Sequence, residues 1–262
     1  MDLNLSGKKA LVCGSSDGIG KAAAMELARM GAAVTLLARN EEKLEAVRKE
    51  LPTPSGQKHD FLVADFDDPI NLESVIFSYI GRNKPFSILV NNTGGPPAGK
   101  AYQAEVEAYV SAFKRHLVCN QVLVKLLWKG MEEEGYGRII NVISTSVKAP
   151  LPNLGVSNTV RGAVANWSKT LANELGEFGI TVNNVLPGAT ETGRLTSIIE
   201  KKAGKTGRSP EEVGGAMKGQ IPLKRFAQPE EVANAIAFLA SPAAAYISGV
   251  NIPVDGGRTP NL

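Results

Sequence analysis

Residues 9–20 read Lys9-Ala10-Leu11-Val12-Cys13-Gly14-Ser15-Ser16-Asp17-Gly18-Ile19-Gly20, an apolar run of strand length followed by glycines in Gly-x-x-x-Gly-x-Gly spacing. Glycine permits positive φ in a tight turn and lets another backbone or a ligand approach closely. A helix that begins in such a turn offers N–H groups and a partial positive charge to a phosphate. The stretch therefore predicts a strand, a phosphate-binding turn and a helix, with the turn formed by Gly14, Ser16, Asp17, Gly18, Ile19 and Gly20.

The rest of the chain repeats this alternation of strand and helix. Apolar runs of strand length lie at Lys9 to Cys13, Ala33 to Leu37, Phe61 to Val63, Ile88 to Val90, Arg138 to Ile143, Ile180 to Leu186 and Val250 to Val254. Amphipathic segments lie at Ile19 to Met30, Glu41 to Leu51, Ile70 to Ile80, Gln103 to Glu134, Gly155 to Phe178 and Pro229 to Ala240. Short continuous apolar strands between helices predict an α/β fold of the doubly wound Rossmann type, with a seven-stranded parallel sheet flanked by helices on both faces.

Length and composition narrow the class of protein. A chain of 262 residues suits one domain, so residues 1–262 are expected to form a single unit. No apolar run approaches the roughly 18 residues of a membrane span, and the start of the chain does not resemble a targeting signal, so a cytoplasmic location without membrane contact is expected. The net charge of +3 is small for this length and does not favour nucleic-acid binding. Cys13 and Cys119 predict buried thiols, and no metal site is expected.

The segment from Gly193 to Gln220 interrupts the regular pattern because it is rich in glycine. It is predicted to be a mobile insertion. A long segment that follows a strand of a doubly wound sheet lies over the ligand crevice, which favours a lid or a substrate-selecting loop. Its basic residues would attract an anionic ligand or would simply be solvent-exposed: Lys201, Lys202, Lys205 and Arg208.

Further motifs follow the other predicted strands. They are Asp65, Asn91-Asn92-Thr93-Gly94, Pro187-Gly188-Ala189-Thr190-Glu191-Thr192, Ile247-Ser248-Gly249 and Val254-Asp255-Gly256-Gly257. With the glycine turn, these motifs make the chain, from about Leu5 to Gly257, resemble a short-chain dehydrogenase/reductase. Its overall pattern is most similar to the 3-oxoacyl-acyl-carrier-protein reductases. The resemblance implies a nicotinamide dinucleotide held by the glycine turn and by Asp65, Asn92, Gly94, Arg161, Pro187, Gly188, Thr190 and Thr192.

The choice between the two nicotinamide dinucleotides depends on the end of the second strand. An acidic residue there would bind the ribose diol and repel a 2′-phosphate, but the chain has Arg39 instead. A guanidinium pairs well with a phosphate, so NADP(H) is expected in preference to NAD(H). The alternative is that Arg39 is only a surface charge. Asp17 also opposes a preference for NADP(H), because many NADP-binding relatives carry a basic residue at its position.

The family's Tyr-x-x-x-Lys pair is replaced here by Ser157 and Arg161. In the family the tyrosine delivers a proton, the lysine lowers its pKa and binds the ribose, and a serine holds the carbonyl oxygen. Ser144 matches that serine, and His116 falls on the position of the family's active-site asparagine. The resemblance therefore implies a catalytic group of Ser144, Ser157, Arg161 and His116, without the usual proton donor.

Two residues are candidates for the missing acid. His116 is a candidate because imidazole titrates near neutrality, although a core histidine satisfied by a backbone carbonyl is an equal alternative. Lys148, on the loop after the fifth strand, would become an acid if burial beside Arg161 lowered its pKa, although an exposed loop lysine is the common case. Ser157 is a poor acid without an adjacent base. The remaining alternatives are that solvent delivers the proton or that no group does.

The expected function is an NADP(H)-dependent oxidoreductase that interconverts a carbonyl and a secondary alcohol in a small molecule, with an atypical proton donor. One alternative is a catalytically inactive dinucleotide-binding sensor or partner subunit, and another is a non-redox enzyme on the same fold. In related proteins the helices at 103–134 and 155–178 form a four-helix interface, so the resemblance also implies a homotetramer. The substrate's identity cannot be read from the sequence.

Overall fold

The computed structural model describes residues 1–260 and contains one parallel sheet of seven strands. The strands are β1 (Lys9–Cys13), β2 (Ala33–Ala38), β3 (Asp60–Val63), β4 (Ile88–Asn91), β5 (Gly137–Val142), β6 (Ile180–Pro187) and β7 (Asn251–Val254). Their order across the sheet is β3-β2-β1-β4-β5-β6-β7, and every neighbouring pair is parallel. The predicted strands and fold class are confirmed.

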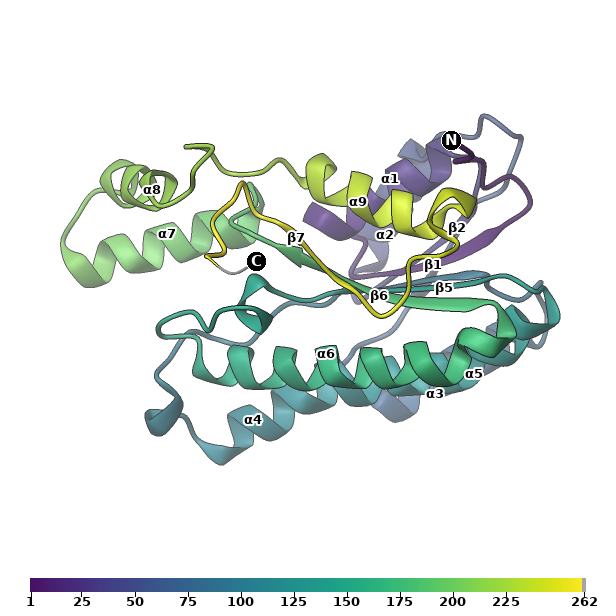
Figure 1. The fold of residues 1–262 in the computed structure, drawn as a ribbon, viewed down its shortest axis with the longest axis horizontal. Helices are drawn as coiled ribbons and strands as arrows, with labels where there is room; N and C mark the ends of the chain where they lie inside the picture. The colour runs from purple at the N-terminus through teal and green to yellow at the C-terminus, as the bar shows by residue number, and fades with distance from the viewer. Residues whose placement is uncertain (261–262) are drawn as a thin grey trace.

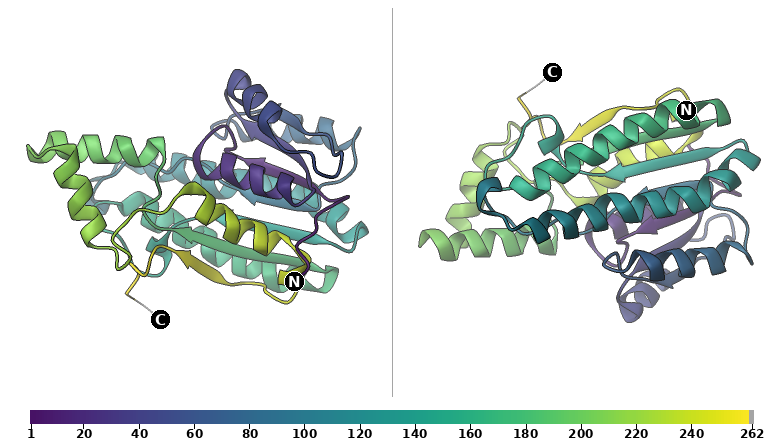
Figure 2. Two further views of the ribbon diagram at one scale, coloured as in Figure 1. Left: turned by 90° about the horizontal axis from the view of Figure 1, so that it is seen from above. Right: turned by 90° about the horizontal axis from the view of Figure 1, so that it is seen from below.

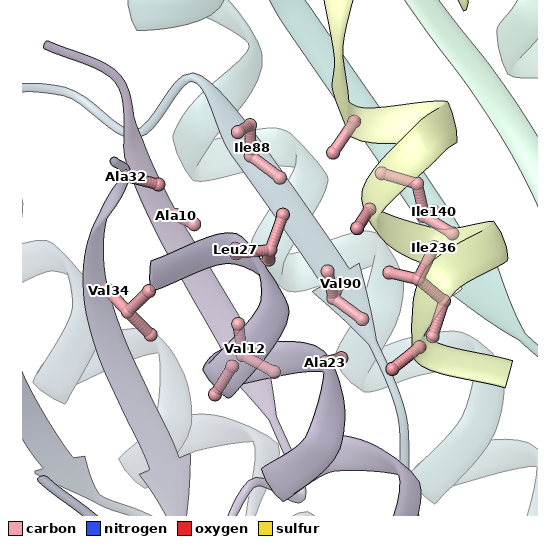
Figure 3. Packing of buried hydrophobic residues seen from close by; sticks show 14 of the residues in the cluster. Ala10, Val12, Ala23, Leu27, Ala32, Val34, Ile88, Val90, Ile140 and Ile236 are labelled. Atoms are coloured by element: carbon pink, nitrogen blue, oxygen red, sulfur yellow. The ribbon is translucent and has the colours of Figure 1, made fainter. Parts of the chain in front are cut away.

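Helices cover both faces of the sheet (Figure 1). One face carries α1 (Gly18–Arg29), α2 (Glu41–Glu50) and α9 (Pro229–Ala240), and the other carries α3 (Pro69–Ile80), α4 (Val106–Phe113), α5 (Cys119–Glu133) and α6 (Gly155–Leu175). Figure 3 shows the first of these layers, where Ala23 and Leu27 of α1 and Ile236 of α9 pack against Val12 and Val90 of the central strands. Small side chains on α1 let the helix lie close to the sheet, which brings the start of α1 next to the end of β1.

The helix expected over residues 103–134 is divided. A 3₁₀ turn at Ala101–Gln103 precedes α4, and a π-helical turn at Lys114–Val118 separates α4 from α5. A π turn adds one residue to the helical repeat and is frequent at functional sites. Here it carries His116 into the protein interior.

Residues 193–220, predicted to be an insertion that forms a lid or substrate-selecting loop, are helical and form α7 (Gly193–Thr206) and α8 (Pro210–Gly219). Thr192 caps α7, Gly207 ends it with φ +67°, and Ser209 and Glu212 form a capping box that starts α8. These end signals outweigh the low helix propensity of the internal glycines. The two helices project beyond the sheet (Figure 2).

Four neighbouring strands are also joined by side-chain amides, three of them buried and the fourth, Asn251, half-buried. Asn91 on β4, Asn141 on β5, Asn184 on β6 and Asn251 on β7 occupy paired positions of the sheet. The Nδ2 of Asn91 donates to Oδ1 of Asn141 at 2.8 Å, Asn141 donates to Asn184 at 3.1 Å, and Asn184 donates to Asn251 at 2.8 Å. Because a shift of one residue would unpair these groups and turn the side chains to the other face, the amides specify the register of β4–β7.

Replacing Asn141 by alanine is expected to lower the free energy of unfolding by about 3 kcal/mol, because Asn91 and Asn184 lose buried partners. Urea denaturation followed by circular dichroism measures the change. Asn166→Ala, an exposed asparagine on α6, is the matched control and should change stability by less than about 0.5 kcal/mol. Equal effects of the two substitutions would contradict a structural role for the buried amides.

Candidate active site

Most of the residues singled out in the sequence lie just beyond the carboxyl ends of six strands. The glycine turn follows β1, Arg39 follows β2, Asp65 follows β3, Asn92 follows β4 and Ser144 follows β5. Pro187 ends β6, and Gly188, Thr190 and Thr192 come after it. Because all strands are parallel, these ends meet at one edge of the sheet, which is where ligands bind in doubly wound folds.

The glycine turn is packed too closely to admit side chains. A Cβ at Gly20 would lie 2.1 Å from the carbonyl oxygen of Gly14, and a Cβ at Gly14 would lie 2.7 Å from that of Asn92. Gly14 also has φ +59°, which disfavours other residues. Asn92 holds the turn from the neighbouring strand end, since its Nδ2 donates to the carbonyls of Cys13 and Gly14 at 3.3 Å each.

The start of α1 meets the start of α7. Asp17 caps α1 by accepting a hydrogen bond from the N–H of Gly18 at 2.7 Å, and a Cβ at Gly18 would lie 3.1 Å from Cγ2 of Thr192. A cavity of about 680 Å³ lies between α1, α7 and the start of α9, and its lining includes Asp17, Gly18 and Thr192 but neither Gly14 nor Asn92. The bare backbone at the N-terminus of α1 itself fits the pyrophosphate of a dinucleotide.

Arg39 and Asp65 lie together at the ends of β2 and β3. Nη1 of Arg39 is 3.5 Å from Oδ2 of Asp65, and the Arg39 side chain is 72% exposed. An exposed ion pair at this distance contributes little to stability. The guanidinium is therefore held only weakly and remains able to bind a phosphate. The Asp17 carboxylate lies against α7, 3.9 Å from where a Cβ of Gly193 would stand.

The segment after β6 and the loop after β4 present backbone at the same edge. A Cβ at Gly188 would lie 2.7 Å from Cα of Asp255, so glycine is required for the contact with the end of β7. Thr190 is buried, and its hydroxyl donates to the carbonyl of Gly188 at 3.2 Å. Open space lies beside Gly94, with no atom within 4 Å of its would-be Cβ, so a ligand can reach this backbone.

Arg161 reaches from α6 to the end of β5. Only 8% of this residue is exposed, and its Nη1 donates to the carbonyl of Val142 at 2.8 Å, two residues before Ser144. Its Nε is buried and has no hydrogen-bond partner. Burial, with a contribution from the nearby cation Arg194, lowers the pKa of Arg161 to about 10, so it stays charged at neutral pH.

His116 faces the same cationic region from the π-helical turn. It is 2% exposed, and its Nε2 has no hydrogen-bond partner. Burial lowers the pKa of His116 to about 2, and the cations Arg161, Arg194 and Arg115 contribute to this shift. The expectation that this imidazole titrates near neutrality is therefore corrected. His116 is neutral at physiological pH and can only donate or accept a hydrogen bond there.

Helix α6 brings the remaining candidates into the same region, since it contacts both the π-helical turn and the 3₁₀ turn Thr145–Val147. Ser144 caps that 3₁₀ turn by accepting from the N–H of Ser146 at 3.1 Å, and Lys148 ends it, half-buried. Ser157 is half-buried on the first turn of α6. The amide of Asn158 binds the backbone of Leu151 and so ties the loop after β5 to this helix.

Arg194, on the first turn of α7, belongs to this region but was not a candidate in the sequence. Its Nη1 donates to the carbonyl of Gly95 at 2.9 Å and its Nη2 to that of Pro96 at 3.4 Å. In the sequence, only its position two residues after Thr192 pointed to the site, and this position lies at the start of the segment predicted to be a lid or substrate-selecting loop. Only the fold shows that α7 directs this side chain toward the loop after β4.

Comparison with known proteins shows similarity over nearly the full chain. The family described as enoyl-(acyl carrier protein) reductase matches residues 14–259. The chain is 33% identical over 250 residues to a putative ketoacyl reductase of Streptomyces coelicolor, with 95% of each chain covered. It is 34% identical over 257 residues to the 3-oxoacyl-[acyl-carrier-protein] reductase of Escherichia coli K12, covering 97% of this chain and 98% of that one.

Solved structures agree with these matches. L-Sorbose reductase from Gluconobacter frateurii, crystallised with NADPH and L-sorbose, superposes with a TM-score of 0.93 at 31% identity, and both chains are covered completely. YwfH, an NADPH-dependent reductase of bacilysin biosynthesis, superposes with a TM-score of 0.92 at 28% identity, covering 98% of this chain and 100% of that one. The similarity therefore extends through the sheet, both helical layers and the α7–α8 segment.

The neutral state of His116 predicts a specific pH dependence of stability. Between about pH 6.5 and the folded-state pKa of about 2, the unfolded chain binds a proton at this residue and the folded protein does not. Stability is therefore lost as the pH falls through this window. Relative to His116→Asn, the protein should lose about 1 kcal/mol more per pH unit between about pH 6 and 4.5 in urea denaturation. The contributions of other titrating groups are the same in both proteins and cancel in this difference. If the free energy of unfolding depends on pH in the same way in wild type and in His116→Asn, the imidazole is not buried and neutral.

Proposed function

Because the chain belongs to the short-chain dehydrogenase/reductase family, we propose that it is an NADP(H)-dependent oxidoreductase that interconverts a carbonyl and a secondary alcohol in a small molecule. Its relatives include 3-oxoacyl-acyl-carrier-protein reductases at 34% identity. The observation that carries this proposal is the close-packed glycine turn of Gly14, Gly18 and Gly20, which leaves the N-terminus of α1 free of side chains at the carboxyl edge of the sheet. The open backbone at Gly94 offers a second contact for the same ligand at the end of β4.

Arg39 supports a preference for NADP(H) over NAD(H). Its weak ion pair with Asp65 is easily replaced by two or more charge-assisted bonds to a 2′-phosphate. Relatives point the same way, since the Bacillus subtilis reductase BacG, 29% identical, is named as NADPH-dependent, and the sorbose reductase structure contains NADPH.

The chain's own residues account for most of the reaction. Bound NADPH supplies a hydride to the carbonyl carbon. Ser144 holds the carbonyl oxygen, and the fixed charge of Arg161 stabilises the negative charge that develops there. Arg161, which stands at the position of the family's lysine, would also donate a hydrogen bond to a ribose hydroxyl of the cofactor. His116 contributes a neutral N–H rather than a titrating proton, as neutral histidines do in other enzymes.

The delivery of one proton is the remaining step. His116 has a pKa far below neutrality and Arg161 remains a cation, so neither exchanges a proton readily at pH 7. We assign this step to Lys148 or to water. Ser157 assists only as a hydrogen-bond donor, because an aliphatic hydroxyl is a poor acid without an adjacent base.

The assembly that we propose is a homotetramer. Apolar side chains of α4 and the turns beside it are exposed, among them Tyr102, Val106, Val110 and Phe113. A contiguous exposed apolar surface is typical of a subunit interface.

Helices α7 and α8 would act as the substrate cover. No helix within residues 1–260 has both the length and the apolar character needed to cross a membrane, and the cytoplasmic location stays a prediction.

Substitution of Arg39 tests the choice of dinucleotide. Arg39→Ala should raise the dissociation constant for NADPH by about 10- to 100-fold, because a charge-assisted contact with the 2′-phosphate is lost. The constant for NADH, measured by the same fluorescence titration, is the internal control and should change less than about twofold. If wild-type protein binds both dinucleotides equally and Arg39→Ala changes neither constant, the preference is refuted.

Turnover decides between an oxidoreductase and a protein that only binds the dinucleotide. NADPH oxidation should be observed with members of a panel of ketones and 3-oxoacyl thioesters, and Ser144→Ala should lower kcat by about 100-fold with an unchanged NADPH dissociation constant. Ser146→Ala, in the same turn, controls for local disturbance. Tight NADPH binding without turnover of any panel member would favour the sensor over the enzyme.

A further inference from the structure

Two guanidinium groups converge beside the loop that follows β4. A point at the would-be Cβ of Gly95 lies 2.8 Å from Nη2 of Arg194 and 3.5 Å from Nη2 of Arg161. The two cations therefore face the same small space, although they come from α7 and α6, which are far apart in sequence. The absence of a side chain at Gly95 lets the Arg194 guanidinium lie against this backbone, close to Arg161.

Within residues 1–260, neither cation has a counter-charge from the protein, since no carboxylate forms an ion pair with Arg161 or Arg194. Arg194 donates only to the neutral carbonyls of Gly95 and Pro96, and Arg161 only to that of Val142. Burial lowers the pKa of both side chains, and their mutual repulsion adds to this for Arg161. Two like charges in a partly buried space destabilise a fold unless an anion joins them.

Unpaired polar atoms mark the same space. Nε of Arg161 and Nε2 of His116 are both buried without a hydrogen-bond partner, on side chains that are more than nine-tenths buried. Buried polar groups are nearly always paired in native proteins, so such atoms indicate a missing ligand. The surroundings of His116 are cationic, with Arg161, Arg194 and Arg115 nearest, although Arg115 is itself paired with Asp67.

We propose that Arg161 and Arg194 bind a carboxylate of the substrate, so that the enzyme acts on an oxo acid or hydroxy acid rather than on a neutral ketone. The inference rests on the proposed function and specifies its substrate class. The planar fork of a guanidinium matches a carboxylate, and two guanidiniums with a neutral imidazole match one such group closely. Ser144 follows the last residue of β5, Val142, by two positions and would hold the carbonyl of the same molecule.

The position of the pair favours the substrate over the cofactor's pyrophosphate. The pyrophosphate turn follows β1, whereas Arg194 binds the loop after β4, and Arg161 binds the end of β5. In the sheet order β1-β4-β5, Val142 is two strands away from the glycine turn, about 10 Å across the sheet. The substrate's carboxylate and the cofactor's pyrophosphate both offer an oxyanion to the two arginines, so the binding of substrate and of cofactor is measured separately.

The test compares oxo acids with their methyl esters. Acetoacetate and benzoylformate, each paired with its methyl ester, are titrated calorimetrically into the intact protein, alone and saturated with NADP⁺. Wild-type protein should bind at least one acid about 10-fold or more tightly than its ester. Arg194→Gln should lose this preference, and Arg194→Lys should restore part of it. Arg82→Gln, an exposed arginine at the opposite end of the strands, should behave as wild type.

The cofactor supplies the second measurement. The NADPH dissociation constant of Arg194→Gln should stay within about twofold of wild type. A rise of about tenfold or more with the acid preference intact would assign Arg194 to the pyrophosphate and overturn the inference. Equal binding of acids and esters by wild-type protein overturns it without any variant, so misfolding of Arg194→Gln does not affect this outcome. If the protein binds NADPH and turns over neutral ketones but binds acids no more tightly than their esters, only this inference is refuted. If it prefers the acids but does not bind NADPH, the proposed redox function is refuted.

Discussion

A row of buried amides across β4–β7 is the constraint on which the arrangement of the site depends. The four asparagines stand at paired positions of neighbouring strands and bind one another in sequence from Asn91 to Asn251. A second contact, from Asn141 to the hydroxyl of Ser168, ties the row to α6. Because amides at these positions are satisfied only in one register, the ends of the four strands are held at defined heights relative to one another. Asn91 is the last residue of β4, so the row runs directly beneath the site.

The site above this row is dominated by positive charge. Among residues 1–260 no carboxylate pairs with Arg161 or Arg194, and burial together with these cations lowers the pKa of His116 far enough to keep it neutral. This arrangement differs from a site built around a titrating acid, because its cations can stabilise an anion but do not exchange protons readily. Arg161 supplies a fixed charge at the position where the family's lysine is expected. Under the proposed function, this charge would stabilise a developing oxyanion and would favour an anionic substrate.

The sequence was most informative where a local pattern determines the structure. The seven apolar runs predicted the strands to within a few residues, and the three glycines identified the turn between β1 and α1. The error at residues 193–220 had a local cause, since Gly204 and Gly214 were taken as helix breakers. Thr192, Gly207 and the pair Ser209 and Glu212 carried the opposite signal, because end caps stabilise a helix more than one internal glycine destabilises it. The π-helical turn at Lys114–Val118 has no such pattern and was not anticipated.

The sequence by itself determined the fold class, the cradle for a dinucleotide and the side-chain chemistry at each family position, because these depend on residue type and on spacing along the chain. The tertiary structure alone decided that Arg194 joins Arg161, that no carboxylate among residues 1–260 is paired with either, and that His116 is buried and neutral. The physical reason is that charge interactions and desolvation depend on distance and burial. Both are set by the packing of α6, α7 and the π-helical turn around the strand ends, and neither can be read from separation in sequence.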